Sequence, residues 1–241
     1  MDFKTSKKSI LSPEIQLGPA GIIHSPNFKR WFDGSKVIND QGSPLVVFHG
    51  TKETAFDTFN SDLIGQSGRS EGAGFYFTTE RSVAEGYGEG GRVLEVYLNI
   101  KNPMRYQEPA FSRAKTVELI SVVAKIEALK EEMDIRDGFL SNFADTYSGS
   151  IERAYQVAAD LLCEEDDALS QIGSLIGSGV SADIVNSGLY QALGFDGFLA
   201  KGFSGMGKSG GQIWIAMKPQ QIKSATENCG LFDPENPNFK S

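Results

Sequence analysis

PLVVFHGT, residues 44–51, is the stretch on which the interpretation of this chain depends. The apolar run Leu45–Phe48 follows a turn-forming Gly-Ser-Pro segment and leads directly into His49. A short apolar run bounded by turn residues is typical of a buried strand. Gly50 and Thr51 come next and are expected to end the strand. The sequence therefore predicts a buried strand with His49 at its end.

The composition predicts one soluble globular domain, or one domain that carries an insertion. The chain has 241 residues, of which 40% are apolar and 22% charged, so it is long enough to bury a sizeable core. Two cysteines, Cys163 and Cys229, form no disulfide framework. The net charge of -8 counts against tight nucleic-acid binding, although a local basic patch remains open. We find no secretory signal and no apolar run of the ~18–20 residues that a membrane helix needs, so we expect a cytoplasmic protein.

Further short segments predict the rest of the sheet. Each is rich in apolar and β-branched or aromatic residues, and several end at Gly or Pro. Helical turns are expected over Glu80–Tyr87, and a short helix begins near Asn27 with Trp31 and Phe32 packed on the core. The predicted strands are Phe75–Thr78, Arg92–Ile100, Phe195–Ala200 and Ile213–Met217.

Between the strands lies a block with helical periodicity, from about 111 to 193. Apolar residues there recur at i, i+3, i+4 and i+7, as at Leu119, Val122, Val123 and Ile126. Strands that flank a helical block predict an α+β fold. The predicted organisation is an N-terminal arm (1–29), a core (30–105 and 190–226), a helical insertion (106–189) and a polar C-terminal tail (227–241).

Two other kinds of site, a phosphate-binding loop and a metal site, have less support in the sequence. GFSGMGKS, residues 202–209, satisfies the GxxxxGK[ST] pattern of a phosphate-binding loop. Such a loop must open a helix, whereas Gly210, Gly211 and a strand-like run follow here, so a nucleotide site at 202–209 is kept as the lesser alternative. His24 and His49 are the only histidines, and no Cys/His cluster has metal spacing, so no metal is expected.

Three motifs occur in a fixed order. They are His49-Gly50-Thr51, the segment GAGFYF at 72–77 with Tyr87 after it, and QIWIAM at 212–217 followed by QIKS at 221–224. This set resembles the ADP-ribosyltransferases of the diphtheria-toxin and poly-ADP-ribose-polymerase type, and is most similar to the ADP-ribosyltransferase domains of phage polyvalent proteins and bacterial toxins. The likeness extends over about 28–103 and 194–239 and includes FKRWF (28–32), VYLNIKNP (96–103), GFDGFL (194–199) and QIKSATENCGLFDPENPNF (221–239).

The resemblance implies a split antiparallel β-sheet core with a helical insertion, and NAD as a substrate. Tyr76 and Tyr87 match the tyrosines that enclose the nicotinamide ring, and His49 matches the histidine that holds the adjoining ribose. Gly50 matches the residue whose backbone pairs with the nicotinamide amide, a close approach that a side chain would prevent. The other residues that the likeness assigns to the NAD site are Thr51, Gly74, Phe75 and Gln221.

The expected chemistry is cleavage of the ribose–nicotinamide bond through an oxocarbenium-like transition state. Many members carry a catalytic Glu on the last strand, but a gapless match places Ile213 at that position. Gln212 is its neighbour and could face the site if a β-bulge turned it inward, and Gln221 is a third candidate. Without the Glu, we expect transfer of one ADP-ribose unit rather than chain elongation.

The sequence thus predicts a mono-ADP-ribosyltransferase that modifies a macromolecule. The acidic charge balance favours a protein acceptor, with nucleic acid left open. Three alternatives remain: a degenerate module that binds NAD without cleaving it, a nucleotide-binding loop at 202–209, and an interaction protein built on the helical block. Toxin, effector and phage roles are not separated by the sequence, and the site of action could be the cytoplasm of a target cell.

Overall fold

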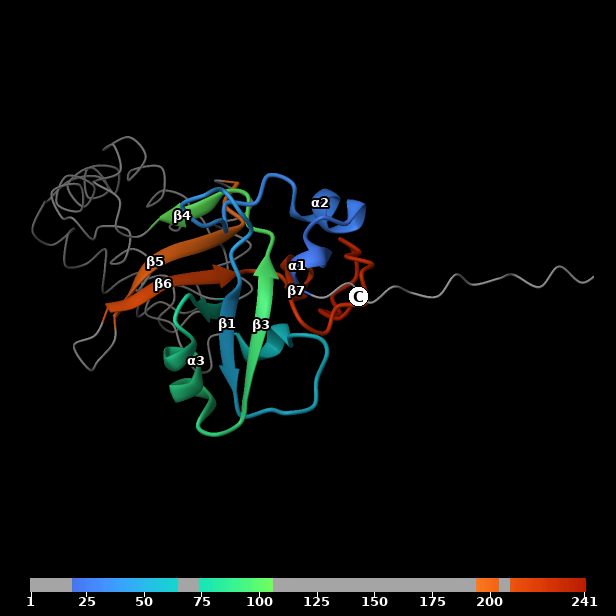
Figure 1. Cartoon of the computed structure of the whole chain (residues 1–241). Coiled ribbons are helices and arrows are strands. Elements are labelled where there is room, and N and C mark those ends of the chain that lie inside the picture. Colours follow the sequence, from blue (N-terminus) through green and yellow to red (C-terminus); the bar gives the residue numbers. More distant parts are fainter. Residues whose placement is uncertain (1–18, 65–73, 106–193, 204–208) are drawn as a thin grey trace, which may run out of the picture.

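The computed structural model of the protein describes residues 19–64, 74–105, 194–203 and 209–241. These residues form one seven-stranded sheet in the order β4-β5-β6-β2-β1-β3-β7 (Figure 1). The helices are α1 (Pro19–Ile22), α2 (Pro26–Phe32) and α3 (Arg81–Gly88), with single 3-10 turns η1 (Ser61–Leu63) and η3 (Pro219–Gln221). The strands are β1 (Val47–Thr51), β2 (Phe75–Thr78), β3 (Arg92–Leu98), β4 (Pro103–Arg105), β5 (Gly197–Phe203), β6 (Ser209–Ala216) and β7 (Ile222–Ser224).

The predicted α+β class is confirmed, and the sheet is mixed. Five neighbouring pairs of strands are antiparallel, and β4 pairs with β5 in parallel. The resemblance implies a split antiparallel sheet, and the parallel pair at this edge departs from that expectation. A parallel pair needs a long connection, and residues 106–196 supply that length. The predicted helices at 106–189 lie outside the described residues.

Most predicted elements are found, with shifted ends. β2 and the predicted strand Phe75–Thr78 coincide, and α3 occupies the predicted helical turns. β1 differs, because it pairs with β3 as far as Thr51 and does not end at His49. At 202–209 the chain leaves β5 and enters β6. Since a phosphate-binding loop must open a helix, the nucleotide-loop alternative is wrong.

The sheet has two distinct faces, because cross-strand partners point to the same side and alternate along each strand. We call one the core face, where apolar side chains bury each other. It is closed by Phe59 and Phe239, and its strand residues include Val47, Phe77, Leu94, Val96 and Trp214. We call the other the α3 face, on which α3 packs, and its residues include Phe48, Gly50, Tyr76, Thr78, Glu95 and Ile213.

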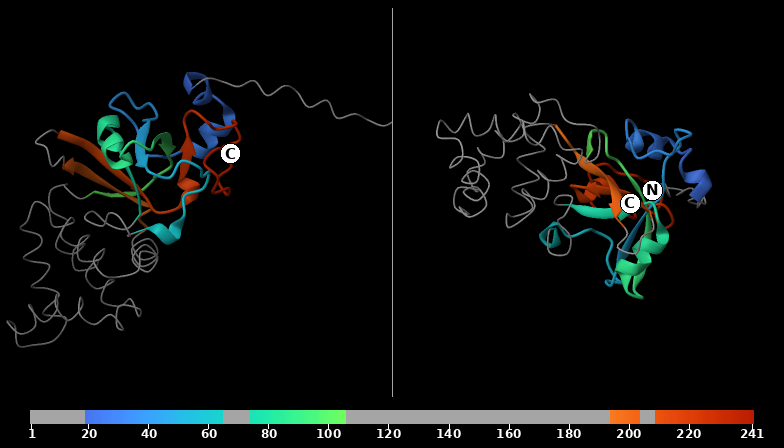
Figure 2. Two further views of the ribbon diagram at one scale, coloured as in Figure 1. Left: turned by 90° about the horizontal axis from the view of Figure 1, so that it is seen from below. Right: turned by 90° about the vertical axis from the view of Figure 1, so that its left-hand side faces the viewer.

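Helix α2 begins close to the predicted position near Asn27, and it buries one face against the sheet. Ser25 caps the helix, since its hydroxyl accepts a hydrogen bond from the Phe28 backbone N at 3.1 Å, and Pro26 occupies the first turn. Phe28, Trp31 and Phe32 are buried against Tyr97 of β3, as expected for Trp31 and Phe32. In two further views, α1 and α2 lie beside the C-terminal segment, residues 227–241, and away from α3 (Figure 2).

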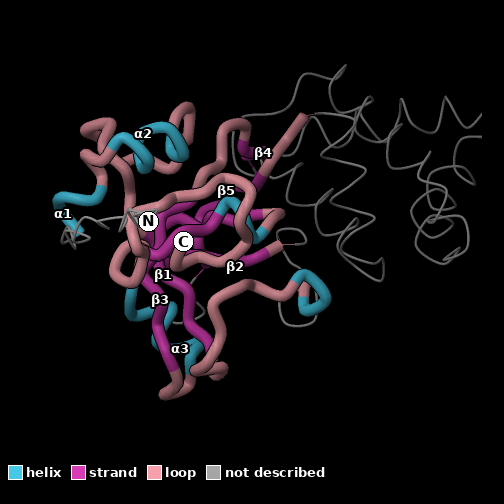
Figure 3. Tube along the Cα trace, turned by 90° about the vertical axis from the view of Figure 1, so that its right-hand side faces the viewer, coloured by secondary structure: helices cyan, strands magenta, loops and turns pink. Residues whose placement is uncertain are grey.

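The C-terminal segment, predicted as a polar tail, belongs to the folded core. Phe232 and Phe239 are almost completely buried, each contributing about 1.5–3 kcal/mol by burial. The segment returns along the sheet: Ser224 N donates to Phe239 O at 2.7 Å, and Phe239 N donates to Asp57 O at 2.8 Å. Figure 3 shows the C-terminus beside the strands.

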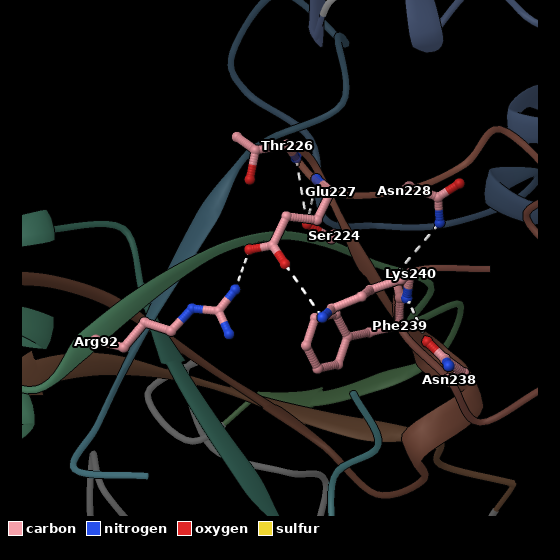
Figure 4. A network of polar contacts seen from close by, with 8 residues as sticks. All are labelled: Arg92, Ser224, Thr226, Glu227, Asn228, Asn238, Phe239 and Lys240. Carbon is pink, nitrogen blue, oxygen red and sulfur yellow. Dashed lines mark hydrogen bonds and ion pairs between the residues drawn. The ribbon is translucent and has the colours of Figure 1, made fainter. Parts of the chain in front are cut away.

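Polar groups fasten the segment further. Glu227 accepts a hydrogen bond from Arg92 and pairs with Lys240 at 3.4 Å, while its backbone N donates to the Ser224 hydroxyl (Figure 4). Partial burial would raise the pKa of Glu227, but hydrogen bonds and charge from Arg92 and Lys240 lower it overall. Lys223 is buried, and its ammonium group donates to Asn236 O, Asn238 O and the Ser241 hydroxyl.

Candidate functional site

His49 lies at a seam where β1 and β2 separate. Phe48 pairs with Thr78, and the ladder between these two strands goes no further, whereas β1 stays paired with β3 up to Thr51. The His49 Nδ1 atom lies 2.8 Å from the carbonyl oxygen of Tyr76. The imidazole thus binds a backbone group of β2 at a level where β1 no longer pairs with that strand.

The contact with Tyr76 fixes the tautomer of His49. A carbonyl oxygen only accepts hydrogen bonds, so Nδ1 must carry the proton and donate it. Burial lowers the pKa of His49, and the bond to the Tyr76 carbonyl opposes this shift without cancelling it. The ring is therefore neutral at pH 7, with an acceptor lone pair on Nε2. An acceptor at this atom is what the predicted role, holding a ribose hydroxyl, requires.

Phe59 is a supporting residue that sequence analysis did not single out. Its ring centroid lies 5.1 Å from that of His49, and the Phe77 ring lies at 5.4 Å. Phe59 also contacts Phe239 of the C-terminal segment at 5.8 Å. The imidazole is therefore held by packing as well as by its hydrogen bond. No local pattern reveals this, because Phe59 stands in an irregular stretch.

Gly50 has a structural role that the sequence did not indicate, in addition to its expected role in binding the nicotinamide amide. A Cβ atom at Gly50 would lie 1.7 Å from the Ala84 carbonyl oxygen and 2.8 Å from the Gly88 backbone N. Helix α3 thus rests directly on the backbone of β1. The missing side chain makes room for the helix, and the helix in turn places Tyr87, in its last turn, near the seam.

The two tyrosines lie on the α3 face, whereas the His49 ring lies on the core face, where it contacts Phe59 and Phe77. Tyr76 is half-buried on the α3 face, opposite Ile215 of β6. Tyr87 belongs to α3, which packs on that face, and its side chain is 72% exposed. A phenol ring with this much free surface can stack on a flat ligand without any loss of core packing.

The neighbouring candidates support the packing of β2 and the end of β1. A Cβ at Gly74 would lie 2.4 Å from Ile215 Cγ2, so only glycine lets β2 approach β6 so closely. Phe75 is buried on the core face. The Thr51 hydroxyl accepts a hydrogen bond from the Glu53 backbone N at 3.1 Å and can still donate its own hydrogen.

The register of β6 separates Ile213 from Gln212. Ile213 pairs with Thr78 and shares the α3 face with Tyr76. Gln212 points to the other face, where its Oε1 accepts a hydrogen bond from Trp214 Nε1 at 3.3 Å. The ladder is regular as far as the pair Lys201–Gln212, and its irregularity lies beyond that pair. The alternative in which a β-bulge turns the Gln212 side chain toward the α3 face is therefore wrong.

Gln221 is occupied by structural hydrogen bonds. Its Oε1 accepts from the backbone N atoms of Met217 and Lys218, at 3.0 and 2.9 Å. Its Nε2 donates to the carbonyl oxygens of Asn99 and Asp196, at 3.1 and 2.7 Å. Two donors and two acceptor sites are all that the amide offers. The geometry gives Gln221 the role of joining the ends of three strands.

The described ranges contain neither a candidate metal site nor a candidate membrane helix. Within residues 19–64, 74–105, 194–203 and 209–241, no group of three or more His, Cys, Asp or Glu side chains could hold a metal ion. None of the helices in this part of the chain is long and apolar enough to cross a membrane.

Comparison with known proteins identifies the family. The family model described as ADP-ribosyltransferase in polyvalent proteins matches residues 39–232. No curated protein and no solved structure matches the chain. The matched range includes β1 with His49, β2 with Tyr76, α3 with Tyr87 and β6 with Ile213. The chain therefore belongs to the family of ADP-ribosyltransferases in polyvalent proteins.

Proposed function

We propose that the protein is a mono-ADP-ribosyltransferase, which cleaves NAD⁺ and transfers ADP-ribose to a macromolecular acceptor, a protein. The observation that carries the proposal is the state of His49. Its Nδ1 is committed to the Tyr76 carbonyl, its ring is neutral, and Nε2 is left as an acceptor. The family match and the neighbouring seam add support.

The nicotinamide half of NAD⁺ would occupy the seam between β1 and β2. Beyond Phe48, backbone groups of β1 that point toward β2 have no ladder partner there, and such groups readily bind a ligand amide. In this arrangement Gly50 pairs with the carboxamide. The exposed ring of Tyr87 stacks on the nicotinamide, with Tyr76 on its other side. A ribose hydroxyl then donates to His49 Nε2.

The reaction exchanges one bond at the ribose C1′ atom for another. The bond to the nicotinamide nitrogen breaks, and nicotinamide leaves as a neutral molecule with the electron pair. Positive charge develops on the ribose, as in glycoside hydrolysis. A nucleophile of the acceptor forms the new bond to C1′ and loses its proton to solvent. The enzyme contributes by holding both halves of NAD⁺, so that binding energy acts at the reacting centre.

Transfer stops at one unit in this proposal because of Ile213. Its side chain stands on the α3 face, at the position that the resemblance matches to the Glu on the last strand of many ADP-ribosyltransferases. An apolar side chain cannot hydrogen-bond the ribose hydroxyl that a growing chain would present.

The remaining parts of the chain are assigned by the same proposal. Residues 106–189 form a helical insertion that shapes access of the acceptor, attached to a core of 30–105 and 190–226 with a split sheet. The net charge of -8 favours a protein over a nucleic acid as the acceptor. The enzyme acts in the cytoplasm, including that of a target cell.

A set of histidine variants tests the proposal by nicotinamide release from NAD⁺. His49→Asn keeps a donor near the Tyr76 carbonyl but removes the Nε2 acceptor, so the fold should survive while release falls by about 100-fold. His49→Gln places an amide near Nε2 and should retain more activity. His24→Gln, at the exposed second histidine, is the matched control and should behave like the wild type. Equal release by His49→Asn and the control would refute the site.

A degenerate NAD-binding module is the second candidate, and the apolar Ile213 favours it. The two candidates differ in one experiment with the wild-type protein. Calorimetry with NAD⁺ should give heat in both cases. Nicotinamide release in the presence of a cell lysate supports the transferase, and binding without any release supports the module.

A further inference from the structure

Glu80 places a carboxylate beside β6, the strand on which Ile213 stands at the position where the resemblance would have a Glu. It is the residue before the first turn of α3, with an extended backbone, and its side chain makes no capping hydrogen bond. The side chain lies over β6 instead. A Cβ atom at Gly211 would be 2.7 Å from Glu80 Cγ and 3.2 Å from Glu80 Oε1. Gly211 also has a φ of +67°, so glycine is required there twice over.

Three hydrogen bonds hold the start of α3 against the strands that carry Thr78 and Ile213. The Glu80 backbone N donates to the Thr78 hydroxyl at 3.0 Å, and Thr78 is the cross-strand partner of Ile213. Thr79 and Gln212 exchange two further bonds, Thr79 N to Gln212 O at 3.0 Å and Gln212 N to Thr79 Oγ1 at 2.9 Å. Gly211 is two residues from Ile213, which is roughly 6.7 Å along a strand. The Glu80 carboxylate therefore lies over β6 at Gly211, two residues from Ile213 on the same strand.

The charge of Glu80 is left for a ligand. The side chain is exposed, and among the described residues no hydrogen bond or ion pair engages its carboxylate. Arg81, the adjacent cation, is turned away, since its guanidinium pairs with Glu85 and Glu95. Glu85, which is exposed, and Glu95, which is half-buried, are thus both paired with Arg81, while Glu80 has no such partner among the described residues.

We propose that Glu80 is a catalytic residue, which supplies the carboxylate that is absent at position 213. It accepts a hydrogen bond from a ribose hydroxyl of NAD⁺ and stabilises the positive charge that develops at C1′. No bond to Glu80 forms or breaks. This inference rests on the proposed function, because it names a further group of the same site.

The test measures kcat and KM for nicotinamide release together with thermal unfolding. Glu80→Gln keeps the shape and removes the charge, so kcat should fall by about 100-fold while KM and Tm stay close to wild type. Ile213→Glu, added to Glu80→Gln, should restore part of the lost kcat, which a merely structural role would not allow. Glu235→Gln, an exposed glutamate of the C-terminal segment, is the matched control and should leave kcat unchanged.

The outcomes separate this inference from the proposed function. If the wild type releases nicotinamide and Glu80→Gln does so at the same kcat, the inference is refuted and the proposed function stands. If the wild type releases none, both fall. Should Glu80→Gln fail to fold, Glu80→Asp replaces it, because Asp is a better helix cap. Its carboxylate is withdrawn by one methylene, so kcat should drop by about 10-fold, and an unchanged kcat would overturn the inference.

Discussion

Gly50→Ala perturbs the contact on which the geometry of the site depends. The new methyl group would lie 1.7 Å from the Ala84 carbonyl oxygen, and real Cβ atoms essentially never come closer than 3.0 Å to such an atom. The difference, 3.0 minus 1.7, means that α3 must move by ~1.3 Å, because packed interiors have no spare room. Overpacking of this kind should lower the free energy of unfolding by about 1–3 kcal/mol. The displaced helix carries Tyr87 with it, and a misplacement near 1 Å can cost about 100-fold in kcat/KM.

The assay for Gly50→Ala combines urea unfolding with nicotinamide release. Gly86→Ala is the matched control, since it changes a glycine of the same helix that has nothing within 4 Å of its Cβ position. This control should raise the free energy of unfolding by up to about 1 kcal/mol and leave release unchanged. Wild-type stability and turnover in Gly50→Ala would refute the reasoning, because the position of α3 would then not depend on the absence of a side chain at residue 50 of β1.

Further predictions concern three other residues, Tyr87, Lys223 and His49. Tyr87→Ala should raise KM for NAD⁺ while Tm is unchanged, because the ring is exposed; kinetics and thermal unfolding check this. Lys223→Met should lower the free energy of unfolding by about 2–4 kcal/mol, since it leaves buried acceptors unpaired. The pKa of Lys223 is lowered from 10.5 to about 8 in the folded protein. Between about pH 8 and 10.5 the Lys223 amine is therefore protonated more fully in the unfolded chain than in the folded one. The free energy of unfolding of the wild type should rise with pH over this range, relative to that of Lys223→Met. The pKa of His49 lies below 6.5, so nicotinamide release should persist below pH 6.5. Because the unfolded chain takes up a proton at His49 before the folded protein does, the free energy of unfolding should fall as the pH drops from 6.5 through the lowered pKa. This fall should be absent in His49→Asn.

Local patterns predicted the elements that carry the site. β2 and α3 were placed correctly because a short apolar strand and a short helix each leave a signal within a few residues. The helix at Trp31 was expected for the same reason. The end of β1 was wrong because Gly50 and Thr51 read as a local stop, whereas pairing with β3, distant in sequence, continues the strand.

The features that could not be predicted from the sequence depend on contacts between residues far apart in the chain. Phe239 stands among prolines and asparagines, yet it is completely buried because the chain returns to the sheet beside Asp57. The role of Gly50 as a seat for α3, and the position of Glu80 over Gly211, depend on backbone atoms far along the chain. Gln221 was expected near the ligand, but its four hydrogen bonds to distant backbone groups give it a structural role.

A crystal structure of the protein with a stable NAD⁺ analogue tests the central claim most directly. The account predicts the nicotinamide ring stacked on Tyr87, its amide bonded to the backbone of Gly50, and a ribose hydroxyl at about 2.7–3.2 Å from His49 Nε2. Nicotinamide bound away from the seam between β1 and β2, or an Nε2 atom that donates rather than accepts, would contradict it.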